Sequence, residues 1–498
     1  MLKKSLMSSA LLASFILLGQ SPRDWRASHE VEILSEYREL LAIPNIARNP
    51  SDMRRNAEML QRMFAKRGVP LQLLEVPDAP PALFGELRVP GATRTLVFYA
   101  HYDGQPVTPS RWLNGDPFQP ELRDASGKLI PWGSVTRFDP EWRLHARSAA
   151  DDKAPIMAFL VALDALRAAG KTPTVNLKFF LDGEEELLSP HLQAIIDKYK
   201  PLLSSDGWVI FDGPTHPSRR QLISFGSRGN FNLELTVYGP NEELHSGHYG
   251  NWAPNPALIL VHLLASMKDE KGRVLIRGFY DDVIPLNAFE RRAIEAMPDM
   301  EAGLRKELEL GTVEVPGRKL QEAVHVPALN IQGLGSAGVG AERRSVIPSS
   351  ATAFLGVRLV KGMQPAKTRN LVLDHLRRQG CFVTEVEPDA ATKMAHSKVC
   401  YVSDAGQGGG QAAVREPLDS EFAVGIVQAV ESVRGAVIRQ PTLGGTLPLA
   451  PITEGLRAPV VLLPIVNHDN NQHTHNENLR LQNLWDGIET ISAVMTMK

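Results

Sequence analysis

The chain has 498 residues, of which 43% are hydrophobic and 22% charged, a mix typical of a soluble globular protein rather than a disordered one. This length predicts about two or three domains. A formal net charge of −2, without a basic stripe interleaved with aromatic residues, argues against nucleic acid as a partner.

The first segment, residues 1–20, has the features of a secretory signal. Lys3 and Lys4 precede an apolar run from Leu11 to Leu18, which is too short for a comfortable membrane span. The match to a small-x-small cleavage site is poor, so an uncleaved anchor is the alternative. We expect a periplasmic or secreted protein whose mature part has no stable membrane span.

Residues 21–225 alternate between segments with helical and with strand patterns. Strands that alternate with helices indicate a mostly parallel sheet with helices on both faces, an α/β domain. The expected helices are 31–41, 54–67 and 154–169, and the expected strands are 94–100, 175–181 and 208–211.

The pattern changes after Phe225. Phe231, Leu233, Leu235 and Val237 alternate with polar residues, as in a strand with one solvated face. We expect strands at 231–237, 351–360 and 382–386 and helices at 256–267 and 367–379. Two helices on one antiparallel sheet describe an inserted α+β domain, ferredoxin-like in type, over residues 226–395. Residues 396–498 then complete the first domain, with helices at 421–433 and 484–495 and a strand at 459–464.

Two cysteines, Cys381 and Cys400, are too few for a disulfide framework and lack CxxC spacing. They form either one bridge in an oxidising compartment or two separate buried side chains. We favour the separate side chains.

Five polar features lie at or just beyond the C-terminal ends of expected strands or at a helix start. In an open α/β sheet, ligands bind at that edge. The features are His101 with Asp103, Asp151 with Asp152, the acidic run 182–186, Asp212, and the segment 473–477.

Each feature alone has a structural explanation. His101 in an isolated His-x-Asp pattern is more often an ordinary histidine at a strand end, and Asp151 or Asp152 could cap a helix. Together they supply imidazole and carboxylate groups without a thiolate, a set that suits zinc, manganese or cobalt. The combination therefore predicts a metal site.

Several segments agree in order and spacing with a known family. In the first domain they are HYDGQP from His101, ADDKAP around Asp151, DGEEELLS from Asp182 and HTHNE from His473. In the inserted domain they are GSRG from Gly226, ELHSG from Glu243, GRVLIRGFYDDV from Gly272 and SVIP from Ser345. The segments of the first domain resemble the M20 metallopeptidases, and those of the inserted domain resemble the carnosinase-like dipeptidase branch.

The resemblance implies two divalent metal ions per subunit, zinc in the first place, with manganese or cobalt as alternatives. It implies that Asp151 bridges the two ions. The first ion would be held by His101, Asp151 and Asp212, and the second by Asp151, Glu186 and His473. A hydroxide between the ions would attack the peptide bond, with Glu185 as general base and Asp103 orienting His101.

Substrate contacts are implied by the same resemblance. His245 would reach across a homodimer interface formed by the inserted domain, the lid, and would stabilise the oxyanion. Arg358 would bind the terminal carboxylate of the substrate. The backbone at Gly444, Gly445 and Thr446 would line the place where the substrate approaches.

The expected function is hydrolysis of a peptide bond in dipeptides or small peptides with a free carboxylate. An N-acyl amino acid deacylase or a carboxypeptidase of the same family is the close alternative. An exported binding protein that has lost activity is the alternative from another class, against which the presence of Glu185 and Asp151 argues. Departures from the family pattern are Ala146 to Ser148 in place of Gly-Arg-Gly, Ala154, Asp182 and Leu188.

Overall fold

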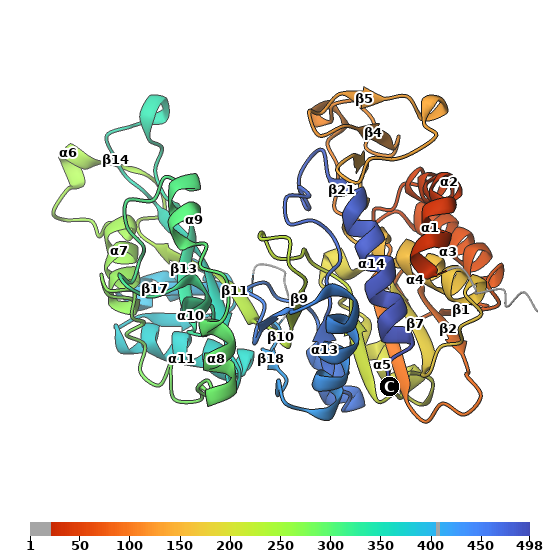
Figure 1. Cartoon of the computed structure of the whole chain (residues 1–498). Coiled ribbons are helices and arrows are strands. Elements are labelled where there is room, and N and C mark those ends of the chain that lie inside the picture. Colours follow the sequence, from red (N-terminus) through yellow and green to blue (C-terminus); the bar gives the residue numbers. More distant parts are fainter. Residues whose placement is uncertain (1–20, 405–408) are drawn as a thin grey trace, which may run out of the picture.

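The structure, a computed structural model, describes residues 21–404 and 409–498 (Figure 1). The signal expected at residues 1–20 lies outside the described residues. None of the helices in this part of the chain has the length and hydrophobicity that a membrane crossing requires.

The first unit is built on an eight-stranded sheet with the order β1-β2-β7-β3-β8-β20-β9-β19. Its central strands β7, β3, β8 and β20 run parallel, as predicted, and antiparallel pairs lie toward the edges. The strands are β1 Gln72–Leu74, β2 Ala82–Leu87, β3 Thr95–His101, β7 Asn176–Asp182, β8 Gly207–Ile210, β9 Leu222–Ser224, β19 Ile438–Gln440 and β20 Val460–Leu462.

Helices cover both faces of this sheet. Along β3, Leu96 and Phe98 face one core and Val97 and Tyr99 face the other, because successive side chains of a strand alternate. The first face carries α1 Pro22–Ser28, α2 Glu30–Leu41, α3 Pro50–Ala65, α4 Lys153–Ala168, α13 Glu421–Arg434 and α14 Leu481–Met495. The second face carries α5 Leu192–Leu203 and the π-helical turn η5 Pro451–Leu456.

Helix α3 begins earlier than the apolar pattern indicates. Asn49 caps it, accepting a hydrogen bond from the backbone N–H of Asp52, and Pro50 occupies the first turn. Capping residues are polar and lie outside the amphipathic repeat, so hydrophobic spacing alone places the start too late.

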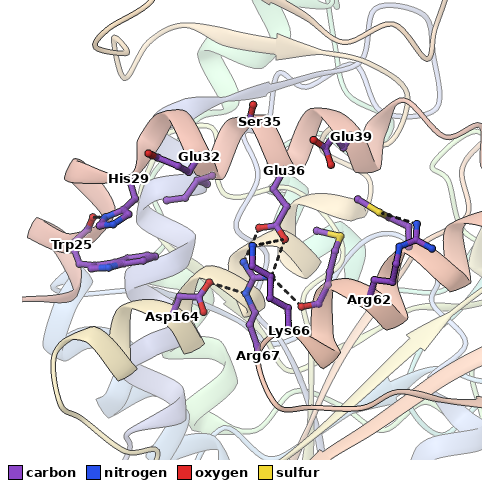
Figure 2. A pocket seen from close by; sticks show the side chains of 13 residues that line it. Trp25, His29, Glu32, Ser35, Glu36, Glu39, Arg62, Lys66, Arg67 and Asp164 are labelled. Carbon is purple, nitrogen blue, oxygen red and sulfur yellow. Dashed lines mark hydrogen bonds and ion pairs between the residues drawn. The ribbon is translucent and has the colours of Figure 1, made fainter.

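An ion-pair network joins α2, α3 and α4 below a surface pocket (Figure 2). Arg67, 4% exposed, lies 2.7 Å from the carboxylates of both Glu36 and Asp164. It also donates to the carbonyl of Met63. This buried cation is therefore neutralised by the chain itself, and its role is to tie three helices together.

The second unit, the lid, has a five-stranded sheet with the order β13-β15-β11-β17-β16. Alternate residues of β11, such as Leu233 and Leu235, share a core with Leu263 of α7 and Leu376 of α11. Both helices thus lie on one face of this sheet. The elements are β11 Gly229–Tyr238, β13 Ala328–Gly335, β15 Ser350–Leu359, β16 Phe382–Thr384, β17 Val399–Ser403, α7 Pro256–Met267 and α11 Pro365–Arg378.

Two details of the lid differ from expectation. Strand β17 pairs with β11 and extends the lid sheet beyond the boundary expected at residue 395. Strand β16 runs parallel to β17, so the sheet is not wholly antiparallel. Strand β17 was not predicted from the sequence, and its pairing with β11 is decided by tertiary packing rather than by local pattern.

The two cysteines form a disulfide, which corrects the expectation of two separate side chains. Cys400 lies in β17, and Cys381 immediately precedes the neighbouring β16. Pairing of these strands places the two Cα atoms 5.8 Å apart, within the range a disulfide spans. The 19 residues between them hide this proximity in the sequence.

Shorter elements complete the chain, and most were not predicted because they are too short for a periodic pattern. A four-stranded sheet combines β21 Asn478–Arg480, β6 Arg143–His145, β4 Glu121–Arg123 and β5 Leu129–Ile130. Two-stranded pairs are β10 Gly226–Ser227 with β18 Val414–Arg415, and β12 Leu244–His245 with β14 Val346–Ile347. The remaining helices are α6 Ser246–Tyr249, α8 Ala288–Glu295, α9 Glu301–Glu307, α10 Leu320–Val324 and α12 Ala390–Ala395, and the 3₁₀ turns are η1 Pro109–Arg111, η2 Trp132–Ser134, η3 Glu185–Leu187 and η4 Gly340–Glu342.

Helix α2 offers a matched test of the first core. Leu34→Ala should lower the free energy of unfolding by about 2–5 kcal/mol, because Leu34 is fully buried and its loss leaves a cavity. Val31→Ala, at a position 49% exposed on the same helix, should change it by about 0.5 kcal/mol or less. Urea denaturation followed by circular dichroism measures both, and equal effects of the two variants would contradict this packing.

Candidate metal centre

The polar residues that follow the central strands meet at one edge of the sheet. His101 ends β3, Glu185 and Glu186 form the turn η3 just after β7, and Asp212 follows β8. These strands are parallel neighbours, so their C-terminal ends lie together. Asp151, before α4, faces the same place.

Two groups of possible metal ligands form there, and they share one residue. His101, Asp151 and Asp212 have ligand atoms within 4.8 Å of one another, and so have Asp151, Glu186 and His473. Asp151 Oδ1 lies 3.0 Å from His101 Nε2, and its Oδ2 lies 3.1 Å from His473 Nε2. The five residues expected as ligands are therefore brought together, with Asp151 between the two groups.

Asp103 connects the two sides of this centre. Its Oδ1 lies 3.2 Å from His101 Nδ1, so it orients the imidazole whose other nitrogen faces Asp151. Its two carboxylate oxygens also accept hydrogen bonds from the backbone N–H groups of Glu185 and Glu186, each at 3.1 Å. One fully buried carboxylate thus positions the candidate ligand at the end of β3 and the turn after β7.

Glu477 has a similar role that the sequence did not reveal. It is fully buried and pairs with Arg147 at 2.8 Å. It also accepts hydrogen bonds from the backbone N–H groups of Ser148, Ala150 and Asp151. Its place at the end of the HTHNE segment was the available signal, although no pattern links it to residues 148–151.

Carboxylates buried close together repel one another, and this disfavours their charged forms. Burial and the charge of Asp151 raise the pKa of Glu186 to about 8 and that of Asp212 to about 6. Burial and the charge of Asp212 raise the pKa of Glu185 well above its ordinary value. The centre therefore favours added positive charge.

The histidines respond in the opposite direction. Burial opposes the charged form of His101, but hydrogen bonds with Asp103 and Asp151 raise its pKa well above the ordinary value. The Asp151 carboxylate, with Oδ2 3.1 Å from His473 Nε2, raises the pKa of His473 to about 9. The protons bound to these two histidines thus place positive charge beside the carboxylates.

The donor set fits divalent cations. It consists of two imidazole nitrogens and three carboxylates, which suit zinc, manganese or cobalt. Asp151 Oδ2 is buried and makes no hydrogen bond of acceptable geometry, although His473 Nε2 lies nearby. This buried carboxylate oxygen, which no hydrogen bond occupies, is therefore free to coordinate a metal ion.

The remaining residues expected at the site lie elsewhere. Arg358 of β15 donates to Thr446 Oγ1 at 2.8 Å, so this pair forms a second polar cluster beside Gly444 and Gly445. His245 is exposed at the junction of β12 and α6, where its ring packs against that of His248. Figure 1 shows α6 at the outer end of the lid, away from the sheet that holds the ligands.

Residues 97–497 match the model of peptidase family M20/M25/M40. The chain is 28% identical to a human Beta-Ala-His dipeptidase over 88% of this chain and 82% of that protein. It is 25% identical to the Cys-Gly metallodipeptidase of Schizosaccharomyces pombe over 93% of both chains. The crystal structure of the M20 family metallo-carboxypeptidase Sso-CP2 from Sulfolobus solfataricus superposes with a TM-score of 0.74 and 27% identity, covering 93% of this chain and 98% of that one. This chain therefore belongs to peptidase family M20/M25/M40 and is a metallopeptidase.

Proposed function

We propose that the chain hydrolyses the peptide bond of dipeptides that carry a free carboxylate, with two divalent cations as cofactors. The observation that carries this proposal is the pair of ligand groups sharing Asp151, with Glu185 buried beside them. Relatives named Beta-Ala-His dipeptidase and Cys-Gly metallodipeptidase, aligned along most of this chain, support dipeptides as the substrate class.

Zinc is the proposed metal, with manganese and cobalt as the alternatives that the same nitrogen and oxygen donors accept. His101, Asp151 and Asp212 would hold one ion and Asp151, Glu186 and His473 the other. When bound, such ions supply Lewis acidity, which acidifies water and polarises the carbonyl of the scissile bond.

Glu185 is the proposed general base. It belongs to neither ligand group, yet its Oε2 lies 4.0 Å from His101 Nε2. Its carboxylate can therefore accept the proton of the attacking water and return it to the leaving amine. The backbone N–H groups of Glu185 and Glu186 both donate to Asp103, which fixes the turn. The two side chains can then have different roles, Glu186 as a ligand and Glu185 as the base.

Arg358 is proposed to bind the substrate's terminal carboxylate. Its guanidinium is half-buried and makes no ion pair with any acidic residue of the described chain. Thr446 holds it against the loop that contains Gly444 and Gly445, whose small residues leave the backbone accessible. A planar guanidinium is suited to a carboxylate because it can donate two parallel hydrogen bonds.

A homodimer formed through the lid is proposed from three features. His245 lies away from the metal ligands of its own chain, so an oxyanion contact from it requires a second copy. Strand β13 is also an edge of the lid sheet. Several exposed apolar side chains lie on β13, α7 and the segment around α6, and exposed apolar surface is typical of an interaction site. They are Tyr249, Trp252, Leu258, Val261, Ile331 and Leu334.

Export to the periplasm or beyond is proposed from the N-terminal pattern of Lys3, Lys4 and the apolar run that follows. The Cys381–Cys400 disulfide supports this location, because disulfides persist in oxidising compartments.

Removal of one C-terminal residue from longer peptides is a second candidate. It is favoured by the similarity to a metallo-carboxypeptidase, and Arg358 would serve it equally well. Comparison of dipeptides, tripeptides and N-acyl amino acids in one assay separates these activities.

Chelation should abolish dipeptide hydrolysis by the purified protein, and zinc, manganese or cobalt should restore it. Glu185→Gln should lower kcat by about 10²- to 10⁴-fold while metal content, measured by atomic emission, stays at the wild-type level. Glu184→Gln is the matched control, because the neighbouring Glu184 carboxylate turns toward His191 instead. A metal-loaded protein inactive on dipeptides, acyl amino acids and longer peptides would favour the binding-protein alternative.

Metal affinity should rise with pH between about 6 and 9. Glu186, with a pKa of about 8, and His473, with a pKa of about 9, hold protons that a cation must displace. Lower pH therefore favours the proton and higher pH the metal, by roughly ten-fold per pH unit for each proton displaced. Competition with a chromophoric zinc chelator measures this, and an affinity that is flat over the range would refute it.

Mixed dimers test His245. His245→Ala and Glu185→Gln should each be almost inactive, yet co-expression should restore roughly a quarter of wild-type activity, because a mixed dimer regains one complete site. The control is the same pair of variants purified separately and assayed without subunit exchange. Failure to recover activity from proven mixed dimers would mean that His245 acts within its own chain or not at all.

A further inference from the structure

Arg228 is a buried cation without an acidic partner. Four arginines are buried in the part of the chain that the structure describes, and Arg228, 8% exposed, is one of them. The other three each have a carboxylate within ion-pair distance: Arg67 with Glu36 at 2.7 Å (Figure 2), Arg147 with Glu477 at 2.8 Å and Arg480 with Asp469 at 3.0 Å.

The hydrogen bonds of Arg228 leave its charge uncompensated. One Nη donates to the carbonyl of Val326 at 2.7 Å, and its Nε has no hydrogen-bond partner. Residues 1–20 and 405–408 contain no Asp or Glu, so no acidic side chain of this protein is left unaccounted for. Burying an unpaired charge costs free energy of folding. A buried, unpaired cation is therefore suited to bind a ligand of opposite charge.

A second cation stands beside it. Asn230, two residues after Arg228, lies opposite Arg358 in the β11–β15 pair. The backbone N–H of Arg228 donates to the carbonyls of Leu443 and Gly445, while Arg358 Nη1 donates to Thr446 of the same loop. Burial and the charge of Arg358 lower the pKa of Arg228 to about 10, a sign of mutual repulsion.

We propose that Arg228 and Arg358 together form a subsite for two carboxylates, so that the enzyme prefers dipeptides with aspartate or glutamate at the C-terminus. This inference rests on the proposed dipeptidase function and on Arg358 as the carboxylate-binding residue. One terminal carboxylate neutralises one guanidinium and leaves the other unpaired. An acidic side chain on the same residue balances the second charge.

Two pairs of probe substrates test the preference without any variant. Ala-Glu and Ala-Gln, like Ala-Asp and Ala-Asn, match in size and differ mainly by one negative charge. Wild-type enzyme should show kcat/KM values about ten-fold or more higher for the acidic member of each pair, chiefly through a lower KM. Equal values, or a preference for the amides, would overturn the inference.

Substitutions of single arginines test whether Arg228 causes the preference for an acidic C-terminal residue. Arg228→Gln should reduce the ratio of kcat/KM for Ala-Glu over Ala-Gln by about ten-fold, and Arg228→Lys should retain part of it. Arg358→Gln should impair both substrates, because both carry the terminal carboxylate. Arg369→Gln is the control, since this lid arginine pairs with Glu385 and Asp404 and should leave the ratio as in wild type.

Thermal unfolding of each variant establishes that it is folded. If Arg228→Gln does not fold, the wild-type ratio and the Arg228→Lys variant still decide the matter. Hydrolysis of Ala-Gln at the rate of Ala-Glu would overturn the dicarboxylate subsite alone, whereas a metal-loaded enzyme that cleaves no dipeptide would overturn the proposed function as well.

Discussion

Mutual repulsion of buried carboxylates is the constraint on which the rest of the structure depends. Asp151, Glu185, Glu186 and Asp212 lie within one small buried volume, and no chain folds readily around such a cluster unless cations balance it. The raised pKa values of Glu185, Glu186 and Asp212 follow from that need. The parallel strands β3, β7 and β8 allow the cluster to form, because they bring their ends to one edge.

Two further carboxylates keep the candidate ligands in place. Asp103 and Glu477 are fully buried. The carboxylate oxygens of both accept hydrogen bonds from backbone N–H groups at or next to candidate ligands. Such anions add to the local negative charge, so their value lies in geometry rather than in stability. They show that the precision of the centre is set by residues that need not touch a metal or a substrate.

The sequence predicted those parts of the fold that repeat regularly. Long amphipathic helices and the apolar strands before His101, Asp182 and Asp212 were visible locally, and polar residues after buried strands indicated a site. The roles of Asp151 and His245 came only from resemblance to a family. Edge strands, the β17 pairing, the disulfide and the contacts of Glu477 depend on chain segments far apart, which single-sequence patterns do not encode.

The metal centre draws on both ends of the first unit, and this has a consequence for synthesis. Asp151 is 322 positions before His473, and Glu477 reaches back 330 positions to Arg147. The ribosome must therefore release the segment that contains His473 before the second ligand group, Asp151, Glu186 and His473, is complete. The nascent polypeptide therefore lacks the complete pair of ligand groups until residues from both parts of the first unit have left the ribosome and packed together.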